Sequence, residues 1–406
     1  MGQVIRGGEQ FETHIEADHR GQIIRQGPDS GAIDAFGRQR VSQPFTLFDS
    51  VLRHSKNAEL WNETISGGTS EHLINESSVR MTVTASGHSI LRRTRKRFPY
   101  QPGKGLNILQ SFAGSEPQAG LVQELGLFDD NNGIALRASG TTVQFVVRSS
   151  TTGSVVENVA NQSEWNIDTA PWLDFSKTNI FTTDLEWLGV GRVRCGFVLD
   201  GEYYYCHEFN HANSLDAVYM TTAVLPLSYA IRATATVSGS MKQICSSVAS
   251  EGGYEPAGAI YIAGRGASNF AAISSETMVA AIRMASGRTD NVILPAQVDV
   301  SLGGKQNENT VAEWRLRLNP TVSGTWIDAA NGRGNVQTMS SGTFSGGTVI
   351  NGGLVAARSS VEFNLQRALE LALGTTAAGE SDILVLTVQC SSSEKATGLL
   401  GWREVL

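Results

Sequence analysis

Short strand-like runs recur along most of this chain, and residues that favour turns separate almost all of them. Examples are SVRMTVTAS, TVQFVVRSS and RVRCGFVLD, and the turn sequences include DDNNG and STTG. Runs of this length, rich in β-branched and aromatic residues and bounded by Gly, Asn, Asp and Ser, are typical of strands in sandwiches and barrels. The sequence therefore predicts an all-β protein built as a β-sandwich or jelly roll.

The distribution of these runs divides the chain of 406 residues into four parts. Residues 1–45 contain many glycines and few large apolar side chains, so they cannot bury enough surface to fold alone. They are either a flexible tail or an anchoring arm that a neighbouring protein orders. Residues 46–240 are predicted to form a jelly roll, 241–255 a connector, and 256–406 a second, smaller β-sandwich domain.

The charge balance of the chain argues against two classes of partner. The net charge is −7 and the isoelectric point is near 5.6. A nucleic-acid-binding protein needs an excess of positive charge facing the phosphates, and an anionic membrane attracts basic segments. The sequence has no apolar run of about 18 residues that would span a bilayer, and its start, MGQVIRGGEQ, lacks the apolar core of a signal peptide. We therefore expect neither nucleic acid nor a membrane as partner, and synthesis in a cytosol.

The segment Asp34–Ser50, DAFGRQRVSQPFTLFDS, closes the N-terminal arm and leads into the first strand patterns. Its elements Asp-Ala-Phe-Gly-Arg-x-Arg-Val-Ser and Pro-x-Thr-Leu-Phe-Asp resemble a junction in structural proteins of tailed bacteriophages. Further along, FDDNNGIALRASGTTVQFVVRSS and FTTDLEWLGVGRVRCGFVLDGEYYYCHEF resemble the paired long strands of a concanavalin-like jelly roll. In the last part, EWRLRLNP, SDIL and the final WRE also resemble phage structural proteins.

This resemblance implies a non-enzymatic structural component of a tailed-phage virion, such as a tail fibre, baseplate, neck appendage or capsid decoration. Such a protein would be made in the cytoplasm of the bacterial host and located in the virion. It implies assembly with other virion proteins and with copies of itself, as a homotrimer by analogy with phage appendages, and no cofactor. Arg38 and Arg40 would then be free to contact a partner.

Two of the four cysteines face each other in a predicted hairpin. In RVRCGFVLDGEYYYCHEF, Asp200 and Gly201 form a favoured two-residue turn, and counting outward from it places Cys195 opposite Cys206. The β-carbons of directly opposed residues lie roughly 4.5–5.5 Å apart, whereas a disulfide needs about 3.8 Å. We therefore expect two adjacent reduced thiols, with oxidation to a disulfide after release from the cell as the alternative.

The segment HEFNH at 207–211 matches the zinc-protease pattern H-E-x-x-H. That chemistry needs a helix, which places both His side chains on one face. The preceding EYYYC is strongly strand-like, and on a strand His207 and His211 would lie about 13 Å apart, too far for one metal ion. We therefore expect the end of a strand here and no metal site.

Concanavalin-like jelly rolls also include glycosidases, whose retaining members carry Glu-x-Asp-x-Glu on one strand. The alternate residues then project their carboxylates onto one sheet face. The nearest match is Thr182-Thr183-Asp184-Leu185-Glu186, where Thr182 replaces the first carboxylate. Because a hydroxyl cannot act as the carboxylate nucleophile, a glycan hydrolase is the least favoured hypothesis. We expect Asp184 and Glu186 to face solvent or to pair with arginines.

The basic run RRTRKR at residues 92–97 has two main interpretations, besides a contact with nucleic acid or a sulfated glycan. On a strand it places Arg92 and Lys96 on one face and Arg93, Arg95 and Arg97 on the other, which is unusual for a sandwich strand. One interpretation is an edge strand whose charges block unwanted pairing. The other is an interface in which Arg93 and Arg95 meet an acidic neighbouring subunit.

Two tryptophans lie in the polar segment SEWNIDTAPWLD and are candidates for stacking on a sugar. These are Trp165 and Trp172. They motivate the alternative function, a carbohydrate-binding module that recognises a glycan on the host surface. The other tryptophans are spread along the chain and are expected in the core or in subunit contacts.

Overall fold

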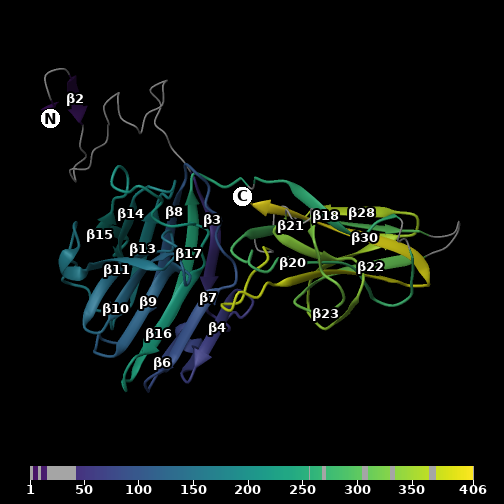
Figure 1. Ribbon diagram of the computed structural model, residues 1–406, viewed down its shortest axis with the longest axis horizontal. Coiled ribbons are helices and arrows are strands. Elements are labelled where there is room, and N and C mark those ends of the chain that lie inside the picture. The colour runs from purple at the N-terminus through teal and green to yellow at the C-terminus, as the bar shows by residue number, and fades with distance from the viewer. Residues whose placement is uncertain are drawn as a thin grey trace.

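A computed structural model gives the structure of the chain, and it describes residues 3–7, 11–15, 43–255, 257–267, 271–303, 310–329, 334–364 and 372–405. Two β-sandwiches lie side by side along the long axis of the molecule (Figure 1). The predicted all-β class, a jelly roll followed by a smaller β-sandwich, is confirmed. Two short strands at the N-terminal end, β1 (Gln3–Gly7) and β2 (Phe11–Ile15), pair as an antiparallel hairpin.

Two antiparallel sheets form the first domain. The seven-stranded sheet has the order β12 (Val156–Asn161), β11 (Thr142–Ser149), β10 (Gly133–Ser139), β9 (Leu121–Phe128), β16 (Leu227–Ala233), β7 (Ser89–Thr94) and β4 (Trp61–Ser66). The eight-stranded sheet has the order β15 (Glu202–Phe209), β14 (Val193–Leu199), β13 (Asn179–Leu185), β8 (Gly105–Ala113), β17 (Gly239–Glu251), β6 (Ser78–Val83) and β5 (Thr69–Leu73), with β3 (Pro44–Val51) also paired to β17. Two short 3-10 turns, η1 (Ile74–Glu76) and η2 (Gln162–Glu164), interrupt the strands.

The core of the first domain lies between these two sheets. Strand β8, GLNILQSFA, alternates strictly between buried and half-buried side chains, as the period of two predicts for a sheet with one covered face. The inward positions of neighbouring strands supply large rings to one continuous cluster, which includes Trp61, Phe112, Phe145, Phe181, Phe197 and Tyr229.

The predicted hairpin at Asp200-Gly201 is present, but its register differs from a simple count. Asp200 and Gly201 both have positive φ, 53° and 86°, as a type I′ turn requires. Leu199 pairs with Glu202, but a bulge between Cys195 and Gly196 shifts the ladder, so that Cys195 faces His207. The prediction that Cys195 faces Cys206 is therefore wrong, because the bulge leaves Cys206 as the extra residue. Both cysteines are free and buried, and burial raises the pKa of Cys206 to about 12.

Two of the expected boundaries fall inside strands. The segment 241–255 is not a connector for most of its length, because Gly239–Glu251 form β17 between β8 and β6. Its alternating residues point Met241, Gln243 and Val248 into the core. The expected end of the arm at residue 45 lies within β3, which pairs with the last part of β17. The first domain thus begins at Pro44 and ends at Glu251.

The second domain is a smaller sandwich of two antiparallel sheets. The first sheet has the order β18 (Ile260–Arg265), β30 (Glu394–Val405), β21 (Val292–Leu302) and β28 (Ser360–Asn364), with β19 (Ala271–Ile273) also paired to β30. The second has the order β24 (Ile327–Asp328), β25 (Val336–Met339), β20 (Thr277–Met284), β29 (Ile383–Cys390), β22 (Val311–Leu318) and β27 (Thr348–Ala356). A separate pair, β23 (Thr321–Ser323) and β26 (Thr343–Ser345), lies outside both sheets.

A polar joint connects the two domains. The carboxylate of Asp382 accepts a charge-assisted hydrogen bond from Arg95, which follows β7. The backbone of Thr375 donates to the carbonyl of Arg95 at 2.6 Å, and the amide of Ala377 donates to the Asn62 side chain at 3.1 Å. A groove of about 530 Å³ lies at this joint, lined by β3 and by both domains.

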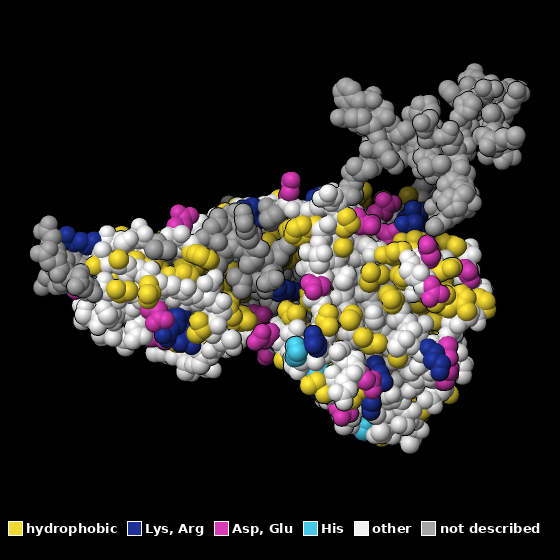
Figure 2. All heavy atoms as spheres, turned by 180° about the vertical axis from the view of Figure 1, so that it is seen from behind, with side chains coloured by type: hydrophobic (Ala, Val, Ile, Leu, Met, Phe, Trp, Pro, Cys, Tyr) yellow, Lys and Arg dark blue, Asp and Glu magenta, His cyan; other side chains and the backbone are white. Residues whose placement is uncertain are grey.

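The surface view shows two lobes, with Lys and Arg side chains dispersed among acidic and apolar ones on the face that is drawn (Figure 2). In the part of the chain that the structure describes, we find no helix with the length and apolar character needed to cross a membrane.

Candidate functional site

The basic run does not lie on an edge strand, so the edge interpretation is wrong. Strand β7 pairs with β16 on one side and with β4 on the other. Arg92 points into the core, where it forms an ion pair with Glu63 and donates to Gln243 at 2.6 Å. The arginine-bearing strand β7 is therefore an interior strand of its sheet, whereas the sequence had suggested an edge strand.

The two arginines proposed for an interface have partners within the chain. Arg93 is buried, pairs with Asp130 at 2.9 Å and donates to the Ser228 hydroxyl at 3.1 Å. Arg95 pairs with Asp382 of the second domain. Arg38 and Arg40, the other predicted interface residues, lie outside the described residues. The acidic neighbour that the sequence suggested for Arg95 is therefore a neighbouring domain of the same chain.

His207 lies in β15, as predicted, and His211 follows the end of that strand. The Nδ1 of His207 accepts a hydrogen bond from the amide of Asn166 at 3.2 Å, and the His211 ring stacks on Tyr219. Burial lowers the pKa of both imidazoles. No group of three or more His, Cys, Asp or Glu side chains with metal-binding geometry occurs among the described residues.

Strand β13 carries the first four residues of the Thr-Thr-Asp-Leu-Glu segment, and Glu186 follows its end. Thr182 is completely buried in the position of the first carboxylate. The Asp184 carboxylate pairs with Arg194 of β14 and accepts a hydrogen bond from the Tyr205 hydroxyl of β15 at 3.2 Å. The pairing of Asp184 with an arginine is as predicted. A buried hydroxyl and a carboxylate already bonded to two neighbours do not form the pair that retaining hydrolysis needs.

Asp184 lines a polar cleft of about 470 Å³ on the outer face of the eight-stranded sheet. Glu251, at the end of β17, also lines this cleft. Burial and the nearby Asp184 raise the pKa of Glu251, against the opposing effect of Arg194. The other side chains and backbone positions around the cleft are Tyr100, Gly103, Lys104, Gly105, Glu186, Leu188, Arg192 and Arg194.

Two tyrosines extend this outer face beyond the cleft. The rings of Tyr203 and Tyr205 stack with their centroids 6.0 Å apart, and Tyr203 is 46% exposed. The Arg194 guanidinium lies 4.1 Å from the centre of the Tyr205 ring. Tyr203 also donates to Asn107 of β8 at 3.5 Å. We call Tyr203, Tyr205, Asn107, Asp184 and Arg194 the tyrosine face. It combines an exposed aromatic surface with polar groups held in fixed positions.

The two tryptophans proposed for sugar stacking have different surroundings. Trp165 is only 5% exposed, its ring stacks on Phe145 at 4.1 Å, and it donates to the carbonyl of Ala160. The prediction that Trp165 is exposed is therefore wrong, because its apolar ring fills the core under a polar loop. Trp172 is 38% exposed and packs edge-on against Phe197 and Tyr204. It lies on the opposite side of β15 from the tyrosine face.

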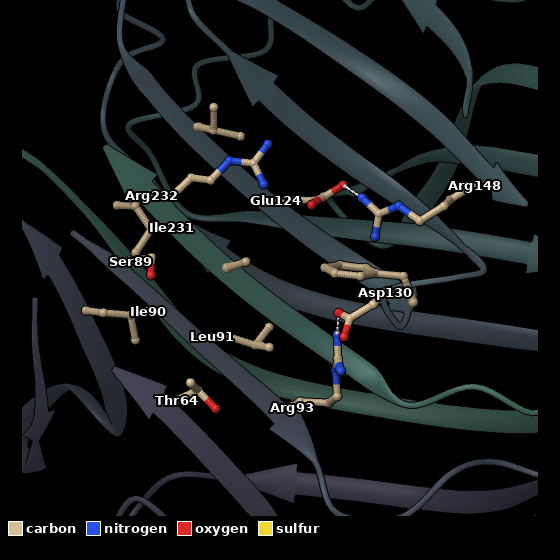
Figure 3. A pocket seen from close by; sticks show the side chains of 13 residues that line it. Thr64, Ser89, Ile90, Leu91, Arg93, Glu124, Asp130, Arg148, Ile231 and Arg232 are labelled. Atoms are coloured by element: carbon tan, nitrogen blue, oxygen red, sulfur yellow. Dashed lines mark hydrogen bonds and ion pairs between the residues drawn. The ribbon is translucent and has the colours of Figure 1, made fainter. Parts of the chain in front are cut away.

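A second hollow lies on the outer face of the seven-stranded sheet. This basin has a volume of about 510 Å³ and is formed by residues of β4, β7, β16, β9 and β11 (Figure 3). Arg148 pairs there with Glu124 at 3.0 Å, and Arg93 pairs with Asp130. No single segment of the sequence predicts this basin, because its lining residues come from five strands that are distant in the chain.

The fold and these faces define a two-domain β-sandwich protein whose first domain is a jelly roll with a polar outer sheet face that carries tyrosines. The sequence matches no protein-family model and no curated protein. Solved structures that resemble it cover about half of the chain. They include a glycoside hydrolase family 16 endo-glucanase from Bacteroides ovatus, 12% identical with a TM-score of 0.35, which overlaps 50% of this chain and 99% of its own.

Two further structures also resemble about half of the chain. One is the CBM2 module of the evolved Dit of Lactobacillus casei BL23 phage J-1, 7% identical with a TM-score of 0.36, over 53% of this chain and 100% of the module. The other is the receptor binding domain of botulinum neurotoxin D, 10% identical with a TM-score of 0.32, over 50% of this chain and 48% of that domain's chain. At these scores the resemblances assign neither a family nor a function.

Proposed function

We propose that this protein is a non-enzymatic structural component of a tailed-phage virion. The observation that carries the proposal is the segment Asp34–Ser50 with its two phage-like elements. The second element forms β3, which pairs with β17 and lines the groove at the domain joint. The segment that follows the proposed anchoring arm is therefore part of the first domain and lies at its joint with the second. Self-association as a trimer and contacts with other virion proteins belong to this proposal.

Deletion of residues 1–33 tests the anchoring role. Because β3 and everything after it remain, the truncated chain should keep the far-ultraviolet circular dichroism and melting temperature of the full protein. Its incorporation into particles should fall at least tenfold in a complementation assay with a phage that lacks the gene. Normal incorporation of the truncated chain would show that these residues are a tail without an assembly role.

The tyrosine face supports a second function, binding of a neutral saccharide from the host surface. Tyr203 offers an exposed ring for the apolar side of a sugar, while Asn107, Asp184 and Arg194 offer donors and acceptors for its hydroxyls. The buried Thr182 hydroxyl at the position of the first carboxylate, and the pairing of Asp184 with Arg194, favour binding over hydrolysis.

Substitution of Tyr203 by Ala tests this function, and Tyr204 provides a matched control. Tyr204 is the next residue on the same strand and is 41% exposed, but it faces Trp172 on the other side. We expect Tyr203→Ala to weaken binding to purified host polysaccharide about tenfold or more, since one aromatic stacking contact contributes about 0.5–1.5 kcal/mol beyond the area it buries. Tyr204→Ala should bind normally. Equal losses, or a loss only in Tyr204→Ala, would move the site to Trp172 and reject the tyrosine face.

A further inference from the structure

We propose that the basin on the seven-stranded sheet is a separate binding site for an acidic saccharide, a sugar that carries a carboxylate or sulfate group. The site lies on the opposite sheet from the tyrosine face and does not depend on the functions proposed above. Positive charge, hydroxyl groups and an apolar floor lie together in this one hollow.

Three guanidinium groups border the basin, those of Arg93, Arg148 and Arg232, and they stand on three sides of it (Figure 3). Two carboxylates, Glu124 and Asp130, also line it. Three positive and two negative groups leave one positive charge in excess, in a protein whose net charge is −7. The basin therefore attracts an anion although the whole molecule repels one.

The three arginines differ in how many contacts hold their side chains within the protein. A binding site needs both fixed groups and a group that can pair with the ligand. Arg148 is fixed by Glu124 and Glu157, both at 3.0 Å, and by the carbonyl of Asp129. Arg232 is exposed, and its side chain has no hydrogen bond or ion pair with any residue that the structure describes. Arg232 can therefore pair with a ligand anion in a two-pronged geometry without breaking an internal contact.

Arg93 can also contact a ligand, because its partner is replaceable. The Arg93 side chain is only 8% exposed and is held by the Ser228 hydroxyl, whereas the Asp130 side chain is 78% exposed at the tip of a turn. An incoming carboxylate or sulfate could take the place of Asp130 while Arg93 stays where it is.

The rest of the basin suits a sugar ring better than a bare ion. Its floor includes Leu91, Val122 and Ala230, which present a low apolar surface for the C–H side of a ring. The hydroxyls of Thr64 and Ser89 border this floor and have no hydrogen-bond partner among the described residues. They are available to the hydroxyls of a sugar, and a volume of about 510 Å³ leaves room for a small ligand.

Titration calorimetry with the full chain tests the proposal, using a trisaccharide of galacturonic acid, the matching neutral trisaccharide of galactose, and sodium sulfate as probes. We expect the acidic trisaccharide to bind, more weakly as salt is added, and the neutral one to bind at least tenfold less tightly at this site. Arg232→Gln should weaken acidic binding at least tenfold, and Arg232→Lys should restore part of it. Arg53→Gln, at an exposed arginine outside the basin, is the matched control and should bind normally.

The outcomes separate this site from the tyrosine face. Tyr203→Ala should leave binding of the acidic trisaccharide unchanged. The proposal is overturned if the wild-type chain does not bind that probe, if Arg53→Gln loses as much affinity as Arg232→Gln, or if the neutral trisaccharide competes equally. Binding of sulfate without binding of the acidic trisaccharide would leave a simple anion site and reject the saccharide.

Discussion

At the scale of single residues, the arginines at 92–97 show how one sequence run can serve several parts of a fold. Each one pairs with a different carboxylate: Arg92 with Glu63, Arg93 with Asp130, Arg95 with Asp382 and Arg97 with Asp129. Every partner lies within the same chain. The basic run therefore organises the first domain and its contact with the second.

Asp129 gives a prediction for acid stability. Burial alone would raise the pKa of its carboxyl, but Arg97 at 2.8 Å and the amides of Asn132 and Asn131 outweigh that effect and hold the pKa below its usual value. Because the folded state favours the charged carboxylate, Asp129 stabilises the fold above its pKa in the unfolded chain, about 3.9. This stabilisation is lost as the pH falls through the lower pKa that Asp129 has in the folded protein. Asp129→Asn should cost about 1–3 kcal/mol of unfolding free energy at pH 7 and reduce the loss of stability in acid.

Urea unfolding measured between pH 7 and pH 3 checks this prediction. The control is Asp216→Asn, at an exposed aspartate in the same domain without an ion pair in the described structure. It should follow the wild-type pH profile. A parallel profile for Asp129→Asn, merely shifted to lower stability, would show that the charge of Asp129 is not the cause.

At the scale of strands, the sequence predicted elements well and their positions less well. The turn at Asp200-Gly201 was predictable because few residue pairs accept two positive φ angles. The bulge beside Cys195 was not, because it adds one residue to a ladder without a local signal in the sequence. The position of β7 between two strands was also hidden, since the carboxylates that neutralise its arginines come from segments distant in the sequence.

The candidate sites show the same division. The alternation of EYYYC indicated a strand, and it could have indicated that Tyr203 and Tyr205 share one face, 6.0 Å apart. Which face of this strand is exposed depends on the opposing sheet, and the sequence does not show that sheet. The sequence therefore predicted Trp165 as the exposed aromatic residue instead. A polar loop predicted exposure for that residue, but its indole packs against Phe145 in the core. The basin that includes Arg232 is formed by side chains from five strands, so it could not be predicted from any one segment.

At the scale of the whole molecule, the two sandwiches are linked by a small number of specific contacts. The Arg95 and Asp382 side chains are 15% and 6% exposed, and Asp382 also accepts hydrogen bonds from the Asn319 side chain and the Gly374 amide. The end of β30 lies on the side of the second domain that faces the first (Figure 1). Because the Arg95–Asp382 ion pair is buried and has directional hydrogen bonds, we expect it to fix the orientation of the two domains. A single substitution at Arg95 tests this expectation.

Arg95→Met should weaken this joint more than either domain alone. It keeps most of the apolar stem but leaves Asp382 as a buried charge without its cation, and the loss of one partner of a buried pair costs about 3–5 kcal/mol. Differential scanning calorimetry should show the second domain melting at a lower temperature, separate from the first, and the double variant Arg95→Met with Asp382→Asn should recover part of the loss because the unpaired charge is gone. Arg53→Met, outside the joint, should melt like the wild type. If Arg95→Met gave the wild-type thermogram, the ion pair would not be what couples the domains, and the backbone bonds of Thr375 and the Asn62 contact of Ala377 would be sufficient for the joint.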